Sequence, residues 1–213
     1  MKKYYYQKSS NSQKVYVSGI IKLAKSITDN YSKGKFLKND DLPDLIREKV
    51  EKGFLPEDSN GIYFVLISDD VKEQMQGDEA RFCVEYCGYH NEEQFKSKGK
   101  MFYAMAGQLS SECLSGCSPN DHFSPNDDPS VDGIAGTIAH ELAEAVSDPW
   151  VNTKRAWNAP DGQENGDLCS TVYGKTSKMS NGALYNYISP NSKTKFLIQE
   201  NFDPVLQSCR QTA

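Results

Sequence analysis

The sequence predicts a single domain of the α/β or α+β class, in which a helix that carries ligand-type side chains packs on a mixed sheet. The length of 213 residues suits one domain with a sizeable core. Two short apolar runs, at 62–67 and 101–106, are typical of strands. Between residues 134 and 148, apolar and polar side chains separate onto opposite faces at helical spacing.

The N-terminal part predicts one strand and one helix. Residues 15–24 alternate loosely between apolar and polar side chains, which favours a strand, although the end of this run could equally begin a helix. Residues 35–40 predict a polar connection. Asp41, as the cap, then begins a helix that continues to about residue 52 and ends at Gly53.

The other elements are strands and loops around the ligand-bearing helix. The run at 62–67 is wholly apolar, so we expect a central strand that is buried on both faces. Residues 118–132 hold three prolines and predict a structured loop before the helix, and 150–167 predict a second loop after it. Residues 184–188 and 195–199 predict a terminal hairpin.

The helix at 134–148 places its apolar side chains on one stripe, which we expect to face the core. At about 100° per residue, this stripe consists of Ile134, Ile138, Leu142, Ala145 and Val146. The opposite face gathers ligand-type residues, namely Thr137, His140, Glu141, Glu144 and Asp148. An amphipathic helix with a solvated acidic face and one stray histidine gives much the same pattern, so this face alone does not define a site.

His140, Glu141 and Glu144 form an HExxE motif, a near relative of the HExxH zinc signature. In that signature residues i and i+4 bind the metal, and the glutamate after the first histidine is the general base. Here Glu144 replaces the second histidine. The motif therefore predicts His140 and Glu144 as metal ligands, and Glu141 as the base that takes a proton from water.

Two carboxylates downstream of the helix add to this motif. Glu164, which we place in a turn, follows Glu144 by twenty residues, and Asp167 comes three residues later. This arrangement resembles the gluzincin metalloproteases, in which a glutamate at about this separation is the third ligand and a nearby aspartate orients the first histidine. The resemblance implies a zincin-like fold and a zinc ion held by His140, Glu144 and Glu164. Asp167 or Asp148 would lie next to these ligands and orient them.

A series of spaced segments resembles one family. The segments are 61–71, 82–90, 113–117, 131–133, 140–144, 148–152, 166–169, 202–204 and Cys209. Together they resemble the secreted phosphate-induced, EXORDIUM-like family best known from plants, and the HELAE sequence at 140–144 resembles its metal-competent members. The family's signal peptide and an early tryptophan-bearing strand have no counterpart before Met1. We therefore expect residues 1–213 to be one EXORDIUM-like domain, truncated at its N-terminus relative to the family.

The six cysteines are an even set, which suits disulfides in an oxidising compartment. They are Cys83, Cys87, Cys113, Cys117, Cys169 and Cys209. Fifteen pairings are open. The resemblance to a secreted family implies that all six are oxidised, with Cys169 joined to Cys209 and the two CxxxC pairs joined to each other. The alternative is a zinc clip in which His90 or His122 joins the CxxxC cysteines; otherwise both histidines are structural or loop residues.

Composition excludes several function classes. A net charge of −5 argues against nucleic acid or an anionic membrane as the partner, and no apolar run reaches the ~20 residues of a membrane span. The resemblances imply a secreted zinc-dependent hydrolase, in first place a peptidase, that acts on a peptide or a matrix or cell-wall component. Tyr173, Tyr185 and Tyr187 are candidate donors to its reacting oxygen. The alternatives are a non-catalytic extracellular binding or signalling protein with a structural or vestigial metal site, and a carbohydrate-directed enzyme.

Overall fold

The chain folds around one long helix, α3 (Pro129–Ser147), and a three-stranded sheet. The computed structural model describes residues 1–38, 40–75 and 80–211. Its other elements are β1 (Tyr5–Tyr6), β2 (Val15–Tyr16), β3 (Phe36–Lys38), α1 (Asp41–Glu51), β4 (Ile62–Ile67), β5 (Lys72–Gln74), β6 (Gly88–Gln94), β7 (Lys100–Gly107), α2 (Leu114–Cys117), η1 (Asp167–Cys169), β8 (Ser177–Lys178), β9 (Leu184–Tyr185), β10 (Tyr187–Ile188), β11 (Lys195–Phe196), β12 (Asn201–Asp203) and β13 (Ser208–Arg210). This mixed α+β architecture agrees with the predicted class, whereas its zincin-like character stays a prediction.

The three-stranded sheet has the order β4-β7-β6, in which β4 runs parallel and β6 antiparallel to the central strand β7. The sheet is therefore mixed, as predicted, and the strand expected at 101–106 is confirmed as β7. The strand expected at 62–67 is confirmed as β4, but its predicted central position is wrong. β4 lies at an edge of the sheet, and Leu66 is 55% exposed.

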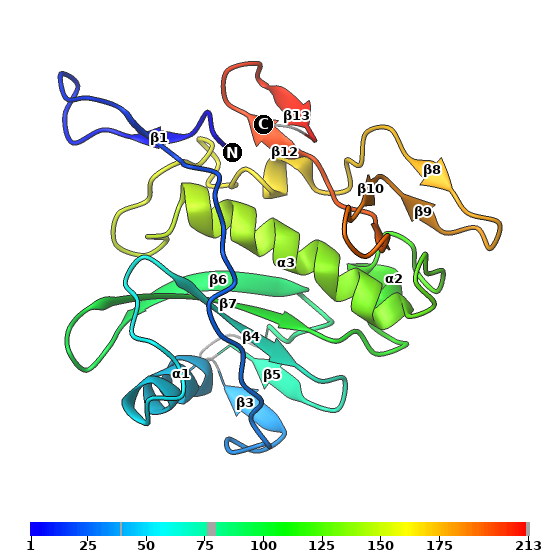
Figure 1. The fold of residues 1–213 in the computed structure, drawn as a ribbon, viewed down its shortest axis with the longest axis horizontal. Coiled ribbons are helices and arrows are strands. Elements are labelled where there is room, and N and C mark those ends of the chain that lie inside the picture. Colours follow the sequence, from blue (N-terminus) through cyan, green and yellow to red (C-terminus); the bar gives the residue numbers. More distant parts are fainter. Residues whose placement is uncertain (39, 76–79, 212–213) are drawn as a thin grey trace.

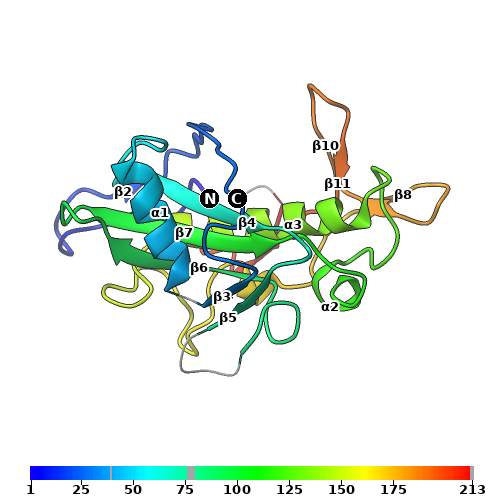
Figure 2. The ribbon, with the colours of Figure 1, turned by 90° about the horizontal axis from the view of Figure 1, so that it is seen from below.

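The sheet lies between α1 and α3 (Figures 1 and 2). On the α1 side, Met101, Tyr103 and Met105 of β7 join Leu42 and Ile46 of α1 in the hydrophobic core. These five side chains are at most 3% exposed. The main apolar core is therefore on the side of the sheet away from α3.

On the α3 side, the sheet allows the helix to approach closely. Ala104 of β7 stands opposite His90 of β6, and directly paired residues of neighbouring strands share a face. A Cβ on Gly88 would lie 2.5 Å from Thr137 Cγ2 and 3.2 Å from Glu141 Oε1 of α3. The absence of a side chain at Gly88 thus brings β6 and its histidine within reach of the helix carboxylates.

The predicted orientation of α3 is confirmed only in part, because Ala145 of the apolar stripe is buried but the ligand-type face is buried as well. Glu141 and Glu144 are each 4% exposed, whereas Ile138, Leu142 and Val146 from the expected core stripe are only half-buried. The cause is a polar pocket between the helix and β6, which receives the carboxylates. Hydrophobic patterning assumes that burial follows polarity, and that assumption fails for a helix that turns charged side chains inward.

Both long helices are present near their predicted positions. α1 follows its prediction and is succeeded by Gly53, which has a φ of +71°. Asp41 is not the cap that we expected, because it lies inside the first turn and its carboxylate accepts a hydrogen bond from the backbone of β3. α3 begins at Pro129, within the segment predicted as a loop, because the Asp128 side chain caps its first turn.

Three further segments differ from their predictions. Of the strand expected at 15–24, only β2 forms, and residues 17–30 have no regular structure. The connection expected at 35–40 contains β3, which pairs in parallel with β5; residue 39 lies outside the described residues. The terminal hairpin is confirmed in part: β10 pairs with β11, while β9 pairs with β8.

The cysteines form three disulfides, as the family resemblance implied. The bonds join Cys83 to Cys113, Cys87 to Cys117 and Cys169 to Cys209. The two CxxxC pairs are thus linked to each other, and no cysteine among the described residues is free. The zinc clip is therefore wrong. Three bonds of this kind are typical of proteins that fold in an oxidising compartment.

Candidate metal centre

A pocket of about 280 Å³ lies between α3, the start of β6 and the segment 164–167. It is lined by Gly88, Tyr89, His90, His140, Glu141, Glu144, Val151, Glu164 and Asp167. The structure thus brings the predicted ligands, the predicted base and Asp167 to one place. The three candidate tyrosines are not among its described lining residues, and the tyrosine that does line it is Tyr89.

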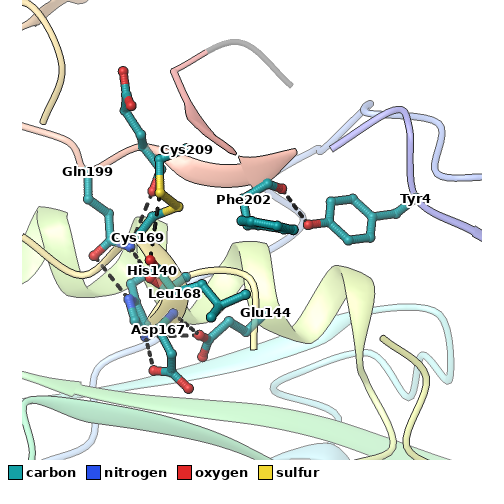
Figure 3. Close-up of a disulfide and its surroundings, with 11 residues drawn as sticks. Tyr4, His140, Glu144, Asp167, Leu168, Cys169, Gln199, Phe202 and Cys209 are labelled. Carbon is teal, nitrogen blue, oxygen red and sulfur yellow. Dashed lines mark hydrogen bonds and ion pairs between the residues drawn. A yellow bond between two sulfur atoms is a disulfide. The ribbon is translucent and has the colours of Figure 1, made fainter. Parts of the chain in front are cut away.

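His140 is oriented by a hydrogen bond on the far side of its ring (Figure 3). The amide nitrogen of Gln199 donates to Gly166 O at 2.8 Å, so the amide oxygen faces His140 Nδ1, at 3.1 Å. An amide oxygen only accepts, so Nδ1 carries the proton and Nε2 is directed at the carboxylates. Nε2 lies 3.2 Å from Glu144 Oε1 and 3.5 Å from Asp167 Oδ1.

His90 is a pocket residue that the sequence offered only to the alternative zinc clip or to a structural role, and not to this site. Its Nε2 lies 3.1 Å from the backbone oxygen of Asp148, and its Nδ1 lies 3.4 Å from Glu141 Oε2 and 3.8 Å from Glu144 Oε2. The strand that carries it is mostly polar, so no periodicity marked that strand. The signal available was its place three residues after a CxxxC pair.

The segment 164–167 is held against α3 from both ends. Asn165, which is fully buried, donates to Ser147 Oγ of the helix at 2.9 Å. Just beyond the segment, the Cys169–Cys209 disulfide joins η1 to β13 (Figure 3). This anchoring fixes the position of the segment's carboxylates relative to the helix.

Gly166 packs directly on the side chains of Glu144 and His140. A Cβ at this position would lie 2.8 Å from Glu144 Oε1 and 3.0 Å from His140 Nδ1. Next to it, the backbone N–H of Asp167 donates to Glu144 Oε1 at 3.0 Å. The turn therefore orients Glu144 with its backbone, and a side chain at position 166 would displace it.

Glu164 and Asp148 both lie against His90. Glu164 Oε1 is buried, accepts no hydrogen bond within the described part of the chain, and lies 3.5 Å from His90 Nε2. Asp148 contacts the histidine through its backbone oxygen, while its buried carboxylate accepts from Ala156 N at 2.6 Å. Of the two carboxylates in the segment 164–167, Asp167 is the one grouped with His140.

Burial and mutual charge shift the pKa values of the pocket. Burial opposes protonation of His140, but hydrogen bonds to two carboxylates outweigh it and raise the pKa to about 11. Burial likewise opposes protonation of His90, whereas its hydrogen bond to Glu141 and the attraction of nearby carboxylates raise the pKa to about 9. Burial raises the pKa of Glu164 to about 8, and it also raises that of Glu141. The carboxylates therefore create a strong demand for positive charge.

Negative charge exceeds positive charge in this pocket. Four carboxylates, from Glu141, Glu144, Glu164 and Asp167, face two imidazoles. With every group ionised, four negative charges meet two positive ones; because the pKa of Glu164 is raised to about 8, this carboxyl is largely protonated near neutral pH and relieves part of the excess. Among the described residues, no lysine or arginine forms an ion pair with any of the four carboxylates, whose ion-pair partners are the two histidines.

Comparison with known proteins places this fold in a family. A family model described as "Phosphate-induced protein 1 conserved region" matches residues 1–212. The chain belongs to this family. Protein EXORDIUM-like 5 and Protein EXORDIUM-like 3 from Arabidopsis thaliana are each 31% identical to it, over alignments that cover 91% of the chain. Protein PHOSPHATE-INDUCED 1 from Nicotiana tabacum is 27% identical over 86% of the chain.

The family resemblance that we inferred from the spaced segments is therefore confirmed. The chain spans 58%, 63% and 62% of the lengths of these three relatives, in the same order. No solved structure matches the chain. No helix among the described residues has the length and apolar character needed to cross a membrane.

Proposed function

We propose that this chain is a secreted, metal-dependent hydrolase, in first place a zinc peptidase, with its active site in the pocket beside α3. The observation that carries the proposal is a set of four carboxylates, of which Glu141 and Glu144 are buried, and two histidines that form ion pairs only with one another among the described residues. Burying unbalanced charge costs free energy, and apolar side chains would fill the same space at lower cost. A divalent cation would favour the ionised form of all four carboxylates and balance the two negative charges that the protonated imidazoles then leave.

The spacing of the candidate ligands supports an ion over direct ion pairs. Charge-assisted N–H···O bonds are about 2.7–2.9 Å long, and Arg47 in this chain reaches Asp44 and Glu93 at 2.7 Å. His140 Nε2 instead lies 3.2 Å and 3.5 Å from its two carboxylate oxygens. Ligands about 2.0–2.2 Å from zinc at tetrahedral angles are about 3.3–3.6 Å apart.

One candidate ligand set consists of His140, Glu144 and Asp167, whose ligand atoms lie within 4.8 Å of one another. Glu164, the third ligand implied by the sequence, lines the same pocket. Zinc, when bound, supplies Lewis acidity, which polarises a carbonyl group and lowers the pKa of water. Glu141 faces the pocket from the same helix and takes the proton of the attacking water. Gln199 keeps the proton of His140 on Nδ1, so that Nε2 stays available to the ion.

The test begins with untagged protein that has been stripped with a chelator and loaded with one equivalent of zinc. Fluorescein-labelled casein serves as the substrate probe. Glu141→Gln keeps the size of the side chain but cannot accept the proton, so it should retain the zinc and hydrolyse the probe about a hundredfold or more slowly. Glu85→Gln is the matched control, because Glu85 is an exposed carboxylate outside the pocket, which accepts a hydrogen bond from Arg81 N at 2.7 Å.

Equal rates for the two variants would remove Glu141 as the base. A zinc-loaded wild-type protein that leaves the probe intact, across several divalent metals, would overturn the peptidase. It would favour the extracellular binding protein with a structural metal.

A further inference from the structure

We propose a second divalent-ion position in this pocket, formed by His90, Glu141 and Glu144, and joined to the His140 position through the carboxylate of Glu144. The proposal rests on the proposed function only for its effect on hydrolysis, because the ligand geometry stands by itself. It also gives a role to His90, which the one-ion site leaves unused.

His90 is held as a ligand by the same device that orients His140. A backbone oxygen can only accept, so the contact of Nε2 with the oxygen of Asp148, at 3.1 Å, places the proton on Nε2. The other nitrogen, Nδ1, is then directed at Glu141 Oε2 and Glu144 Oε2. A histidine whose outer nitrogen donates to an oxygen presents its inner nitrogen to a metal.

The two oxygens of Glu144 serve different histidines. Oε1 lies 3.2 Å from His140 Nε2, and Oε2 lies 3.8 Å from His90 Nδ1. A carboxylate that faces two ligand groups with its two oxygens has the arrangement of a bridge between two ions, which lie about 3.5–4 Å apart in two-metal sites. In each group, the three ligand atoms lie within 4.8 Å of one another.

The plain structural interpretation, a buried ion pair between His90 and Glu141, explains these contacts less well. Nδ1 lies 3.4 Å and 3.8 Å from the two carboxylate oxygens, beyond the about 2.7–2.9 Å of a charge-assisted hydrogen bond. A dication at Nδ1 draws on the excess negative charge of the whole pocket.

The second position takes Glu141, the proposed base, as a ligand. An ion there holds the carboxylate lone pairs that would otherwise accept a proton from water. Hydrolysis should therefore rise with the first equivalent of zinc and fall about a hundredfold when the second position fills, which is the usual contribution of a general base. The pocket would then respond to the concentration of free metal.

The experiment measures stoichiometry and magnetic coupling, which do not depend on activity. Chelator-stripped protein is titrated with zinc by calorimetry and, separately, with cupric ion as a paramagnetic probe. We expect two ions per chain. In electron paramagnetic resonance spectra, the second equivalent of cupric ion should broaden and diminish the signal of the first. His90→Gln keeps a donor for the oxygen of Asp148 but removes the inner nitrogen, so it should bind one ion and show an undiminished signal. His122→Gln is the matched control, because His122 is exposed beside Asp121 and should leave both ions in place.

One ion per chain in the wild type, or two coupled ions in His90→Gln, would overturn the second position. If His90→Gln fails to fold, Glu141→Gln replaces it in the titration with the same expected loss of one ion. Two coupled ions without hydrolysis would overturn the hydrolase and leave the second position standing. One bound ion together with hydrolysis would overturn the second position and leave the hydrolase standing. No bound ion would overturn both the second position and the metal-dependent hydrolase.

Discussion

Ion binding at His140 should appear as a large, reversible gain in thermal stability. A ligand that binds only the folded chain stabilises it by about 4 kcal/mol at a thousandfold excess over its dissociation constant. For a chain of 213 residues, each 1 kcal/mol moves Tm by about 2–4 °C. Saturating zinc should therefore raise Tm by about 8–16 °C relative to the chelated protein, and a chelator should reverse the shift.

The perturbation that tests the site is His140→Ala. In the candidate ligand set of His140, Glu144 and Asp167, the imidazole of His140 supplies the one nitrogen ligand, and its Nε2 faces the two carboxylates. The variant should lose most of the zinc-dependent shift, whatever its own Tm, because the shift compares one protein with and without the ion. The comparison therefore separates the loss of a ligand from any general loss of stability.

Differential scanning calorimetry of the untagged wild type, His140→Ala and His122→Ala supplies the measurement. His122 is an exposed surface histidine, so its loss should leave the full shift in place. A wild-type Tm that does not respond to zinc, manganese, cobalt or a chelator would refute the reasoning from charge balance. Equal shifts in the two variants would refute the assignment of the ion to His140.

Three further outcomes are expected. Replacing Cys169 and Cys209 together by serine should lower the free energy of unfolding by about 4 kcal/mol in urea titrations, the loop-closure value for a separation of 40 residues. Gly166→Ala should weaken zinc affinity about tenfold or more by calorimetry, because its methyl group meets two ligand side chains, whereas Gly116→Ala, with open space around it, should not. A hydrogen bond from Lys3 lowers the pKa of Asp203 to about 2. The ionised Asp203 carboxylate therefore stabilises the fold fully above about pH 4, and this stabilisation is lost as the pH falls to about 2. Asp203→Asn should remove this part of the acid dependence of the urea midpoint.

Local patterns predicted the elements whose signals lie within one segment. The apolar runs became β4 and β7, the start and stop residues at 41–53 marked α1, and the periodic segment became α3. The order of the strands could not be predicted in this way, because the burial of a strand depends on its neighbours. The run at 62–67 is the more apolar of the two, yet β7 took the centre because it pairs on both sides. β6 was missed because its polar residues face the pocket and the loop at 148–153.

The candidate site divides in the same manner. His140 and Glu144 followed from helical spacing together with the likeness of their motif to the HExxH signature, and Glu164 and Asp167 followed from resemblance to a metalloprotease pattern. His90 comes from a strand that begins more than forty residues before α3, and it reaches the site through the antiparallel register with β7. No local rule connects it to the helix, because the contact exists only once the sheet has formed and Gly88 has let the helix approach.

The burial of the glutamates of α3 is itself an argument for function. A helix that only stabilised the fold would bury Ile138, Leu142 and Val146 fully and leave its glutamates in water, which lowers the free energy on both faces. This helix buries Glu141 and Glu144 and leaves those apolar side chains half-buried. Departures of this kind from local patterning are expected where a sequence serves a site instead of a core. The buried carboxylates need more counter-charge than the two histidines supply when all are ionised, and the group that we propose for this role is a divalent ion.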